Sequence, residues 1–145
     1  MEGSNINLQD LKEGTFLVNV MGIVFDTKTK KILIGKKEND THIPELSWRF
    51  PGGNAGEKEE LDYYLKKEVK DKTNLDVEPI GVIFAKTYSE NRKIMSIYYL
   101  CGITGGEEKA QDAFKEIKWV DPEELEEHLT TSFHPKLKEY ILNLK

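Results

Sequence analysis

The sequence predicts an α/β sandwich, in which helices pack against a β-sheet, and three features of the chain support this class. Several short segments are rich in valine, isoleucine and aromatic residues, which favour strands. One charged segment in the middle of the chain, residues 59–73, follows two adjacent glycines and is expected to be helical. After residue 120 the apolar residues take helical spacing. Strands mixed with one central helix and a helical C-terminus give an α/β sandwich.

The strands are expected at residues 15–25, at a segment that starts with residues 32–34, and at residues 48–50, 80–87, 93–103 and 116–120. A polar turn at 26–31 joins the first two strands into a hairpin, and a charged loop at 36–44 precedes the third. Pro51, Gly52 and Gly53 then interrupt both strand and helix, so we expect a glycine turn there.

The C-terminal region is expected to form two helices. In the first, Asp121 is placed to cap, Pro122 fits the first helical position, and Glu124 completes the spacing of a capping box. Leu125 and Leu129 are spaced to face the core. The second begins near Pro135 and has apolar residues at positions i, i+3, i+4 and i+7, namely Leu137, Tyr140, Ile141 and Leu144.

Length and composition indicate one globular domain, residues 1–145, with a heavily charged surface: 38% of the residues are hydrophobic and 32% are charged. A net charge of −5 argues weakly against general binding to nucleic acid or to a membrane surface. Residues 1–19 lack the pattern of a signal peptide, and no apolar run reaches the roughly 20 residues of a membrane span. Cys101 is the only cysteine and lies in an apolar run, so we expect a buried, inert thiol and a cytoplasmic protein.

The most informative segment runs from Trp48 to Leu75, where carboxylates stand on a helix face that begins with apolar residues. Leu61, Leu65 and Glu68 share one face of this helix, and Asp71 lies at its edge. Two preceding glycines let the backbone approach a ligand closely and turn its carbonyls inward. Carboxylates next to such a turn indicate a site for a hard cation in phosphate chemistry.

This segment resembles the signature of the Nudix hydrolases (MutT-like proteins), G-x5-E-x7-R-E-U-x-E-E-x-G-U, where U is a bulky apolar residue. Laid on without gaps from residue 53 to residue 75, the signature is matched at Gly53, Glu59, Glu68, Val69 and Leu75. Further similarity lies upstream in residues 48–52 and downstream in Trp119-Val120 followed by residues 123–125. The resemblance therefore covers most of the chain and implies an α-β-α sandwich with a mixed central sheet.

Four positions of the box differ from the signature. Lys67 for arginine and Asp71 for glutamate are conservative changes. Asn74 for glycine is mild, because asparagine is the next-best residue for a left-handed helix end. Lys72 is the serious departure, since it puts a cation where the family has a second adjacent carboxylate.

The resemblance implies a pyrophosphohydrolase that cleaves a nucleoside diphosphate linked to another moiety, with Mg²⁺ or Mn²⁺ as cofactor. By resemblance, Glu68 is a metal ligand or the base that acts on the attacking water, Asp71 is another ligand, and the Gly52 carbonyl contributes a further oxygen. Glu59 corresponds to a position that often pairs with the arginine replaced here by Lys67. Gly53, Glu59 and Lys67 are thus structural positions of the box.

Lys72 leaves two outcomes open. An ammonium about 5 Å from a divalent ion is opposed by roughly 6 to 7 kcal/mol at an effective dielectric constant near 20. The long side chain could instead swing into water or onto the substrate phosphates, where it would replace part of the electrostatic role of the metal. The alternative to an enzyme with a weakened metal site is therefore a catalytically impaired module that binds a nucleotide.

The resemblance also suggests candidate residues outside the box, at positions that often have a function in Nudix hydrolases. Lys37 ends the second strand, where a basic residue often contacts phosphate, and Phe133 precedes the last helix near the expected substrate pocket. A distant glutamate often serves as general base. Here Glu107, Glu108 and Glu116 are the candidates, with Glu116 preferred. The substrate class stays open among nucleoside triphosphates, dinucleoside polyphosphates, nucleotide sugars and ADP-ribose, with a slight preference for the first two.

Overall fold

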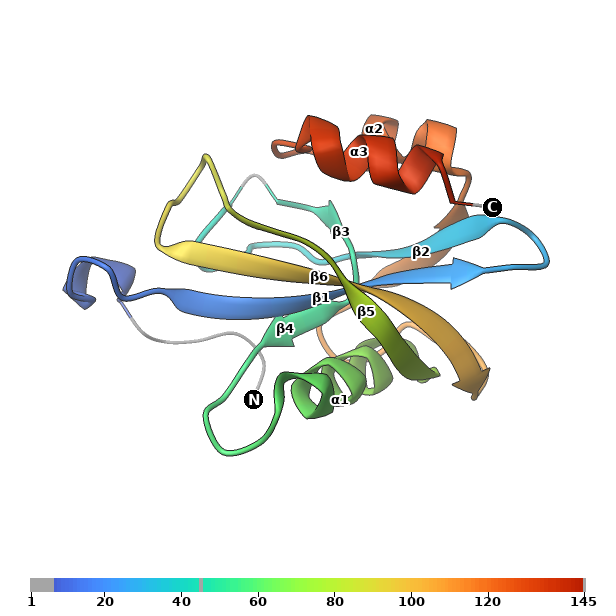
Figure 1. Ribbon diagram of the computed structural model, residues 1–145, viewed down its shortest axis with the longest axis horizontal. Helices are drawn as coiled ribbons and strands as arrows, with labels where there is room; N and C mark the ends of the chain where they lie inside the picture. The colour runs from blue at the N-terminus through green and yellow to red at the C-terminus, as the bar shows by residue number, and fades with distance from the viewer. Residues whose placement is uncertain (1–6, 45, 145) are drawn as a thin grey trace.

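The structure is a computed structural model that describes residues 7–44 and 46–144. Within these residues the strands are β1 (Leu17–Asp26), β2 (Lys31–Lys36), β3 (Trp48–Arg49), β4 (Gly52–Asn54), β5 (Asp76–Thr87), β6 (Ile94–Gly105) and β7 (Glu116–Val120). The helices are α1 (Leu61–Thr73), α2 (Leu125–His128) and α3 (Pro135–Leu142), with short 3-10 helices at Leu8–Asp10 and Pro122–Glu124. The expected strands are all present, with shifted ends, and Figure 1 shows their arrangement.

Strand β1 lies at the centre of the sheet. The sheet is mixed, as the resemblance to the Nudix signature implied. The strand order is β3-β2-β1-β6-β5, with β4 paired to β1 and β7 paired to β2. Strands β1 and β6 run parallel, while β2 and β4 pair antiparallel with β1. The centre of the sheet therefore brings residues 52–54 alongside residues 19–21 of β1.

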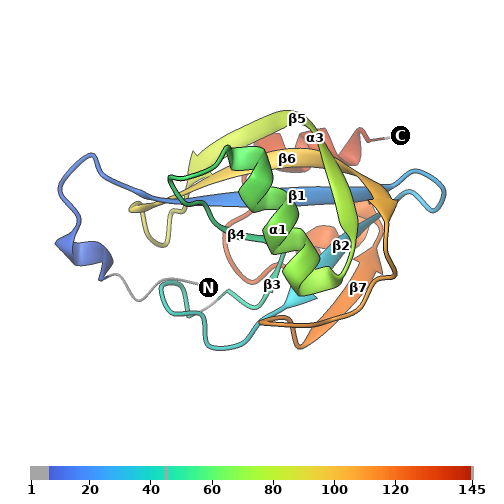
Figure 2. The same ribbon diagram turned by 90° about the horizontal axis from the view of Figure 1, so that it is seen from below.

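Two hydrophobic cores lie on opposite faces of this sheet. On one face Val20 and Val24 of β1 pack with Leu65 and Val69 of α1. On the other, Met21, Ile23 and Phe25 belong to the core that includes residues of α2 and α3. Successive residues of a strand point to opposite faces, so β1 serves both cores. Figures 1 and 2 show α1 and the C-terminal helices on opposite sides of the sheet, which confirms the α-β-α sandwich.

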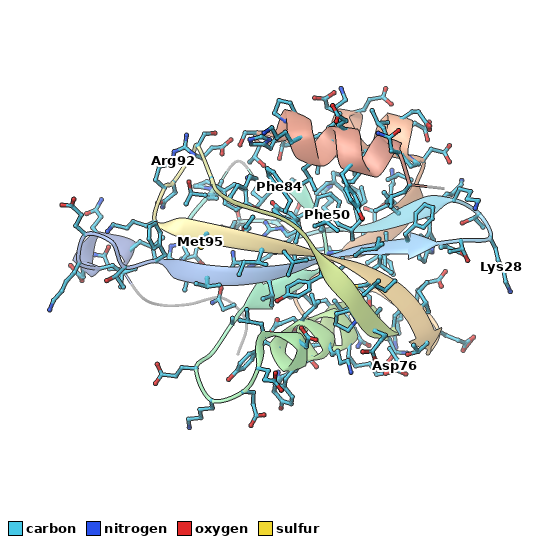
Figure 3. All side chains as sticks on the ribbon, viewed as in Figure 1. Lys28, Phe50, Asp76, Phe84, Arg92 and Met95 are labelled. Carbon is cyan, nitrogen blue, oxygen red and sulfur yellow. The ribbon has the colours of Figure 1, made fainter. Side chains whose placement is uncertain are left out.

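Phe50 and Phe84 belong to the second core, where Phe50 meets Tyr98 edge to face at 5.9 Å between ring centroids. Figure 3 shows both phenylalanines on the side of the sheet that α3 covers. Leu137 and Ile141 of α3 are each 1% exposed, as their helical spacing predicted, whereas Tyr140 stays 39% exposed. The apolar periodicity therefore located the buried face of α3 correctly but included one residue too many.

Three local expectations differ from the structure. The glycine turn is a strand, β4, because residues 52–54 pair with β1. Helix α1 begins at Leu61 rather than Glu59, since the Tyr64 hydroxyl accepts the amides of Lys58 and Glu59 and holds them in a loop. After Asp121, whose side chain makes no capping bond, the chain forms a 3-10 turn and then one turn of α-helix in place of a longer capped helix.

Cys101 is 1% exposed, in agreement with the expected buried thiol. Burial, with the nearby Asp62 and Glu78 carboxylates, raises the pKa of this thiol to about 12. The thiolate is the reactive form of cysteine, so this side chain is chemically quiet in the folded protein. Among residues 7–44 and 46–144, no helix has both the length and the apolar character needed to cross a membrane.

Candidate functional site

The first part of the candidate site is the contact between α1 and the glycines of β4. Glu68 is only 6% exposed and packs against Gly53, where a Cβ atom would lie 2.3 Å from Glu68 Oε1. At Gly52 a Cβ atom would lie 2.1 Å from the carbonyl oxygen of Val20, which is backbone and cannot yield. Only glycine lets β4 fit between β1 and the carboxylate of Glu68.

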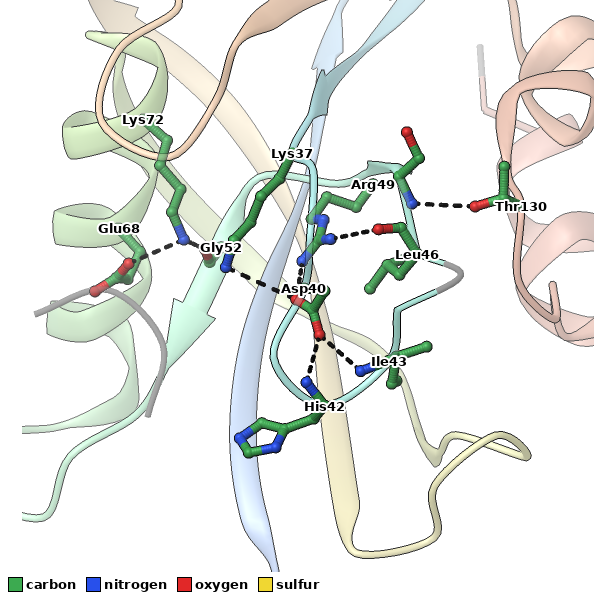
Figure 4. Close-up of polar contacts among 11 residues, drawn as sticks. Lys37, Asp40, His42, Ile43, Leu46, Arg49, Gly52, Glu68, Lys72 and Thr130 are labelled. Carbon is green, nitrogen blue, oxygen red and sulfur yellow. Dashed lines mark hydrogen bonds and ion pairs between the residues drawn. The ribbon is translucent and has the colours of Figure 1, made fainter. Parts of the chain in front are cut away.

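Lys72 joins these two elements. Its ammonium nitrogen donates a hydrogen bond of 2.5 Å to the Gly52 carbonyl and pairs with Glu68 Oε1 at 3.3 Å. Glu68 and Lys72 are one helical turn apart, so they share the face of α1 that looks at β4. Lys72 is 4% exposed. Figure 4 shows its side chain reaching toward Glu68 and Gly52.

A loop before β7 holds the end of α1 at Lys72. The amide of Gln111 donates to the Lys72 carbonyl at 3.2 Å, and the Gln111 side chain donates to the Lys70 carbonyl at 2.9 Å. The ring of Phe114, itself buried, has its centroid 6.0 Å from the Lys72 nitrogen. The loop therefore contacts both the backbone and the side chain of Lys72 and stabilises its inward position.

Asp71 does not join this cluster, and the expected convergence of Asp71 with Glu68 and Gly52 is wrong. Its carboxylate accepts a hydrogen bond of 2.8 Å from Lys67, and both side chains are more than 40% exposed. The physical reason is the i, i+4 spacing of Lys67 and Asp71, which lets them pair along the outer surface of α1. Lys67 consequently pairs with Asp71, and not with Glu59 as the resemblance implied.

Lys37 lies with Asp40 and Arg49 in a polar cleft beside Lys72 (Figure 4). The Asp40 carboxylate accepts from Arg49 Nη1 at 2.8 Å and lies 3.7 Å from the Lys37 nitrogen. It also accepts the backbone amides of His42 and Ile43, at 3.1 and 2.9 Å. Burial opposes the charged carboxylate, but Arg49 and the two amides outweigh it and lower the pKa of Asp40 below its ordinary value.

The cleft has a volume of about 60 Å³ and reaches from β4 to the start of β1. Three of the side-chain atoms that line it are buried without a hydrogen-bond partner in the described part of the chain: Asn19 Oδ1, His42 Nε2 and Arg49 Nε. Buried polar atoms are normally paired, so these atoms indicate that water or a polar ligand belongs in the cleft. The space is enough for a few water molecules.

Sequence reasoning missed Asn19, Asp40 and His42 as lining residues and assigned no role to Arg49. Arg49 carried a signal, because it belongs to the upstream similarity around residues 48–52. The sequence gives no such signal for Asp40, because Asp40 lies in a charged loop and its place in the cleft depends on the hydrogen bond with Arg49.

Two further predicted residues lie away from Lys72. Phe133 lines a neighbouring cavity of about 20 Å³, which shares Arg49 with the polar cleft, but Phe133 is not among the residues that line the cleft itself. Glu116 is exposed on β7, opposite Lys36 of β2, and is not among the residues that line the cleft. The structure thus brings together Glu68, Gly52, Lys72 and Lys37 of the predicted set.

Comparison with known proteins supports the same fold. The family model of the NUDIX domain matches residues 15–143. A MutT protein from Methanosarcina mazei has a solved structure with a TM-score of 0.74 at 18% identity, over 90% of this chain and 96% of that one. An ADP-ribose pyrophosphatase from Streptococcus suis gives a TM-score of 0.65 at 20% identity, over 88% of this chain and 90% of that one. At these identities the likeness concerns the fold.

Curated relatives match more locally. The 8-oxo-dGTP diphosphatase of Buchnera aphidicola is 38% identical over 58 residues, which are 40% of this chain and 42% of that enzyme. The match therefore spans less than half the length of that relative. A MutT-like protein of Streptomyces ambofaciens is 23% identical over 120 residues, 83% of this chain and 73% of that protein.

The fold and the family match define the class of this protein, a Nudix domain. The chain belongs to the Nudix hydrolase family, and residues 53–75 are a degenerate form of its signature.

Nudix hydrolases generally use a divalent metal ion, but the donor set of this chain does not fit one. Of the expected ligands, Asp71 is paired on the surface and the position of Lys72 supplies a cation. No group of three or more histidine, cysteine, aspartate or glutamate side chains suited to a metal ion occurs among residues 7–44 and 46–144. Of the oxygen donors expected for Mg²⁺ or Mn²⁺, the Glu68 carboxylate and the Gly52 carbonyl are at this place in the described residues, and both contact the Lys72 ammonium instead.

Proposed function

We propose that this chain is a pyrophosphohydrolase that cleaves a nucleoside diphosphate linked to another moiety, and that it binds the phosphates in the polar cleft. Membership of the Nudix family supports the reaction class. The observation that carries the site is the meeting of Lys72, Glu68 and the Gly52 carbonyl at the edge of a cleft that also contains Lys37 and Arg49. Cations and amides are the groups that recognise phosphate oxygens.

The proposed roles follow from charge and position. Arg49 offers a planar fork that can bind phosphate oxygens in pairs, while Lys37 and Lys72 act as point charges. Glu68 does not itself line the cleft, but it pairs with Lys72, which does, and it is our proposed acceptor of a proton from an attacking water. The Asp40 carboxylate pairs with both Arg49 and Lys37 in this structure. Substrate phosphates would therefore compete with Asp40 for these two cations.

The substrate is proposed only by class. Two similar proteins are named an 8-oxo-dGTP diphosphatase and an ADP-ribose pyrophosphatase, and both names denote cleavage of a nucleoside diphosphate linkage. Nucleoside triphosphates or dinucleoside polyphosphates are our preferred candidates, ahead of nucleotide sugars and ADP-ribose. We further propose that residues 1–145 form a single Nudix-like domain. A cytoplasmic location stays a prediction, as does the absence of nucleic-acid partners.

A second candidate function, a nucleotide-binding module with impaired catalysis, is favoured by one observation. Lys72 lies between the two oxygen donors expected to hold a metal ion. A site with this arrangement keeps its attraction for phosphates and lacks the metal that normally activates water in the family.

A phosphate-release panel separates the two functions. Wild-type protein is incubated with each nucleotide class in Mg²⁺, in Mn²⁺ and in a chelator, and binding of the same nucleotides is measured by titration calorimetry. Release of phosphate or pyrophosphate from at least one class supports the hydrolase. Binding without release under all three conditions supports the module, and neither binding nor release contradicts both.

The role of Glu68 is tested by Glu68→Gln, which removes a charge at nearly constant volume. We expect kcat to fall by roughly 10²- to 10⁴-fold, as for loss of a general base. Circular dichroism should show an unchanged fold. Glu78→Gln is the matched control, because Glu78 is an exposed carboxylate on β5 that pairs with Lys66. An unchanged rate in Glu68→Gln would mean that this carboxylate takes no part in the reaction.

A further inference from the structure

The ammonium group of Lys72 lies where the Nudix box is expected to hold a divalent ion. Its nitrogen is 2.5 Å from the Gly52 carbonyl oxygen and 3.3 Å from Glu68 Oε1. A Mg²⁺ ion bound by both oxygens would lie about 2.0–2.1 Å from each. An ion and the ammonium would therefore compete for the same two oxygens, and the like charges of the two cations oppose joint occupancy.

Lys72 is held in this position by more than its ion pair. Its 4% exposure leaves almost no surface in water, and the loop with Gln111 and Phe114 covers the end of α1. Moving the ammonium out would separate it from the Glu68 carboxylate, which is itself buried. Separating a buried ion pair costs free energy. The ion pair therefore helps to hold the lysine in the site.

A resident ammonium supplies part of what a metal ion supplies. It neutralises Glu68, fixes the Gly52 carbonyl and adds a positive charge to the cleft that holds Lys37 and Arg49. A single positive charge attracts a phosphate less strongly than a divalent ion does, but it requires no ion from solution.

We propose that Lys72 is a built-in cation that takes the place of the divalent ion, so that the cleft binds a phosphoric anhydride without a metal. This inference rests on the proposed function in one respect, the identity of the anhydride as ligand. The exclusion of the metal rests on the positions of Lys72, Gly52 and Glu68 alone.

The first experiment measures metal binding without any substrate. Mn²⁺ is titrated into wild type, Lys72→Glu and Lys66→Glu, with free Mn²⁺ followed by electron paramagnetic resonance. Lys66 is on the same helix in an exposed pair with Glu78, so Lys66→Glu makes the same charge change away from the site. We expect Lys72→Glu to bind Mn²⁺ at least about tenfold more tightly than wild type, and Lys66→Glu to match wild type.

Two results of this titration would overturn the proposal. One is tight binding of Mn²⁺ to wild type that is lost in Glu68→Gln, because the ion would then occupy the site in the presence of Lys72. The other is an equal gain of affinity in Lys72→Glu and Lys66→Glu, which would reflect net charge alone. Should Lys72→Glu fail to fold, the wild-type and Glu68→Gln titrations still decide the question.

The second experiment measures anion binding with imidodiphosphate, the nitrogen-bridged analogue of pyrophosphate. Calorimetry is done in a chelator and in Mg²⁺, with correction for the magnesium complex in solution. We expect wild-type affinities within about twofold of each other in the two buffers, and a loss of at least about tenfold in Lys72→Met. Lys66→Met, the exposed control, should bind as wild type does.

Binding that needs Mg²⁺ would contradict the built-in cation. Equal binding by Lys72→Met and wild type would contradict it as well. Absence of imidodiphosphate binding in both buffers would instead count against the proposed function, while the Mn²⁺ titration would still decide whether Lys72 excludes the metal.

Discussion

Lys72 shows how one side chain changes the chemistry of an otherwise recognisable site. Its stem is long enough to reach water, the substrate or the protein interior, and the structure has it pointing inward to Gly52 and Glu68. A buried ammonium needs an opposite charge and an acceptor, and both are present here. The sequence left open a lysine that weakens the metal site and a lysine that swings into water or onto the phosphates. The structure shows a lysine that contacts two of the oxygen donors expected for the metal.

Asp40 provides a residue-scale test through pH. Its pKa is lowered in the folded protein: burial opposes the charge, and Arg49 with the His42 and Ile43 amides overcomes this. Below its ordinary pKa the unfolded chain binds the proton more readily than the folded one. The contribution of Asp40 to stability is therefore complete above about pH 5 and is lost as pH falls through the folded-state pKa.

We expect the free energy of unfolding of wild type to fall more steeply than that of Asp40→Asn between about pH 5 and pH 3. Urea unfolding followed by circular dichroism at several pH values measures the difference. Asp76→Asn is the control, since Asp76 is exposed in a pair with Lys70. Parallel curves for wild type and Asp40→Asn would show that the Arg49 pair does not survive in solution.

At the scale of elements, the end of α1 decides where Lys72 stands. Asn74 takes the left-handed conformation, φ 64°, and its amide bonds to the Lys70 carbonyl at 2.9 Å. The Asn74 side chain also donates to the Glu107 carbonyl at 3.0 Å, which ties the helix end to the loop before β7. The replacement of glycine by asparagine in the box is thus tolerated as the sequence predicted, and it adds a contact.

The backbone conformation of Asn74 can be tested by two substitutions. Asn74→Ala should lower the free energy of unfolding by about 1–2 kcal/mol, because a Cβ atom without a compensating polar group is strained at positive φ. Asn74→Gly relieves that strain and loses only the side-chain bond, so it should stay within about 1 kcal/mol of wild type. Urea denaturation measures both values, and equal losses would assign the effect to the Glu107 contact instead.

Strand β4 is the element that sequence reasoning did not foresee. A run of proline and two glycines is typical of a turn, yet residues 52–54 pair with residues 19–21 of β1. The glycines are required there because Gly52 lies against the Val20 carbonyl and Gly53 against Glu68. Glycines weaken a strand in isolation, but here they permit one, because β1 and the Glu68 side chain approach the backbone of β4 closely.

At the scale of the whole molecule, the cleft is smaller than a nucleotide. Its volume is about 60 Å³, whereas pockets for ligands of this size typically exceed 300 Å³. Lys37 and residues 40–43 line one side of the cleft, and Asp40 joins this segment to Arg49. We therefore expect that binding of nucleotide phosphates shifts this segment and displaces the Asp40 carboxylate from Lys37 and Arg49.

This motion predicts a change in hydrogen exchange. The amides of His42 and Ile43 donate to the Asp40 carboxylate, and they lose this acceptor if phosphates displace Asp40 from Lys37 and Arg49. We expect faster exchange at these two amides when ADP is bound, with no acceleration in β6, which pairs with β1 and β5. Exchange measured by NMR with and without ADP tests this, and slower exchange at His42 and Ile43 would show that the segment closes on the ligand instead.

The sequence by itself determined the class of fold, most strand positions, the buried face of α3 and the family. These follow from local periodicity and from the spacing of residues 53–75, both of which are properties of neighbours along the chain. It also determined that Glu68 faces inward, because its place on α1 is set by helix geometry alone.

The tertiary structure decided what Lys72, Asp71 and Asp40 do. Lys72 takes its acceptor from Gly52, 20 residues earlier, and Asp40 takes its partner from Arg49 across the wall of the cleft. Asp71 had a suitable cation one helical turn away in Lys67 and paired with it on the surface. Long charged side chains can reach several partners, so their choice depends on which charges the fold brings within about 4 Å, and that information is not local in the sequence.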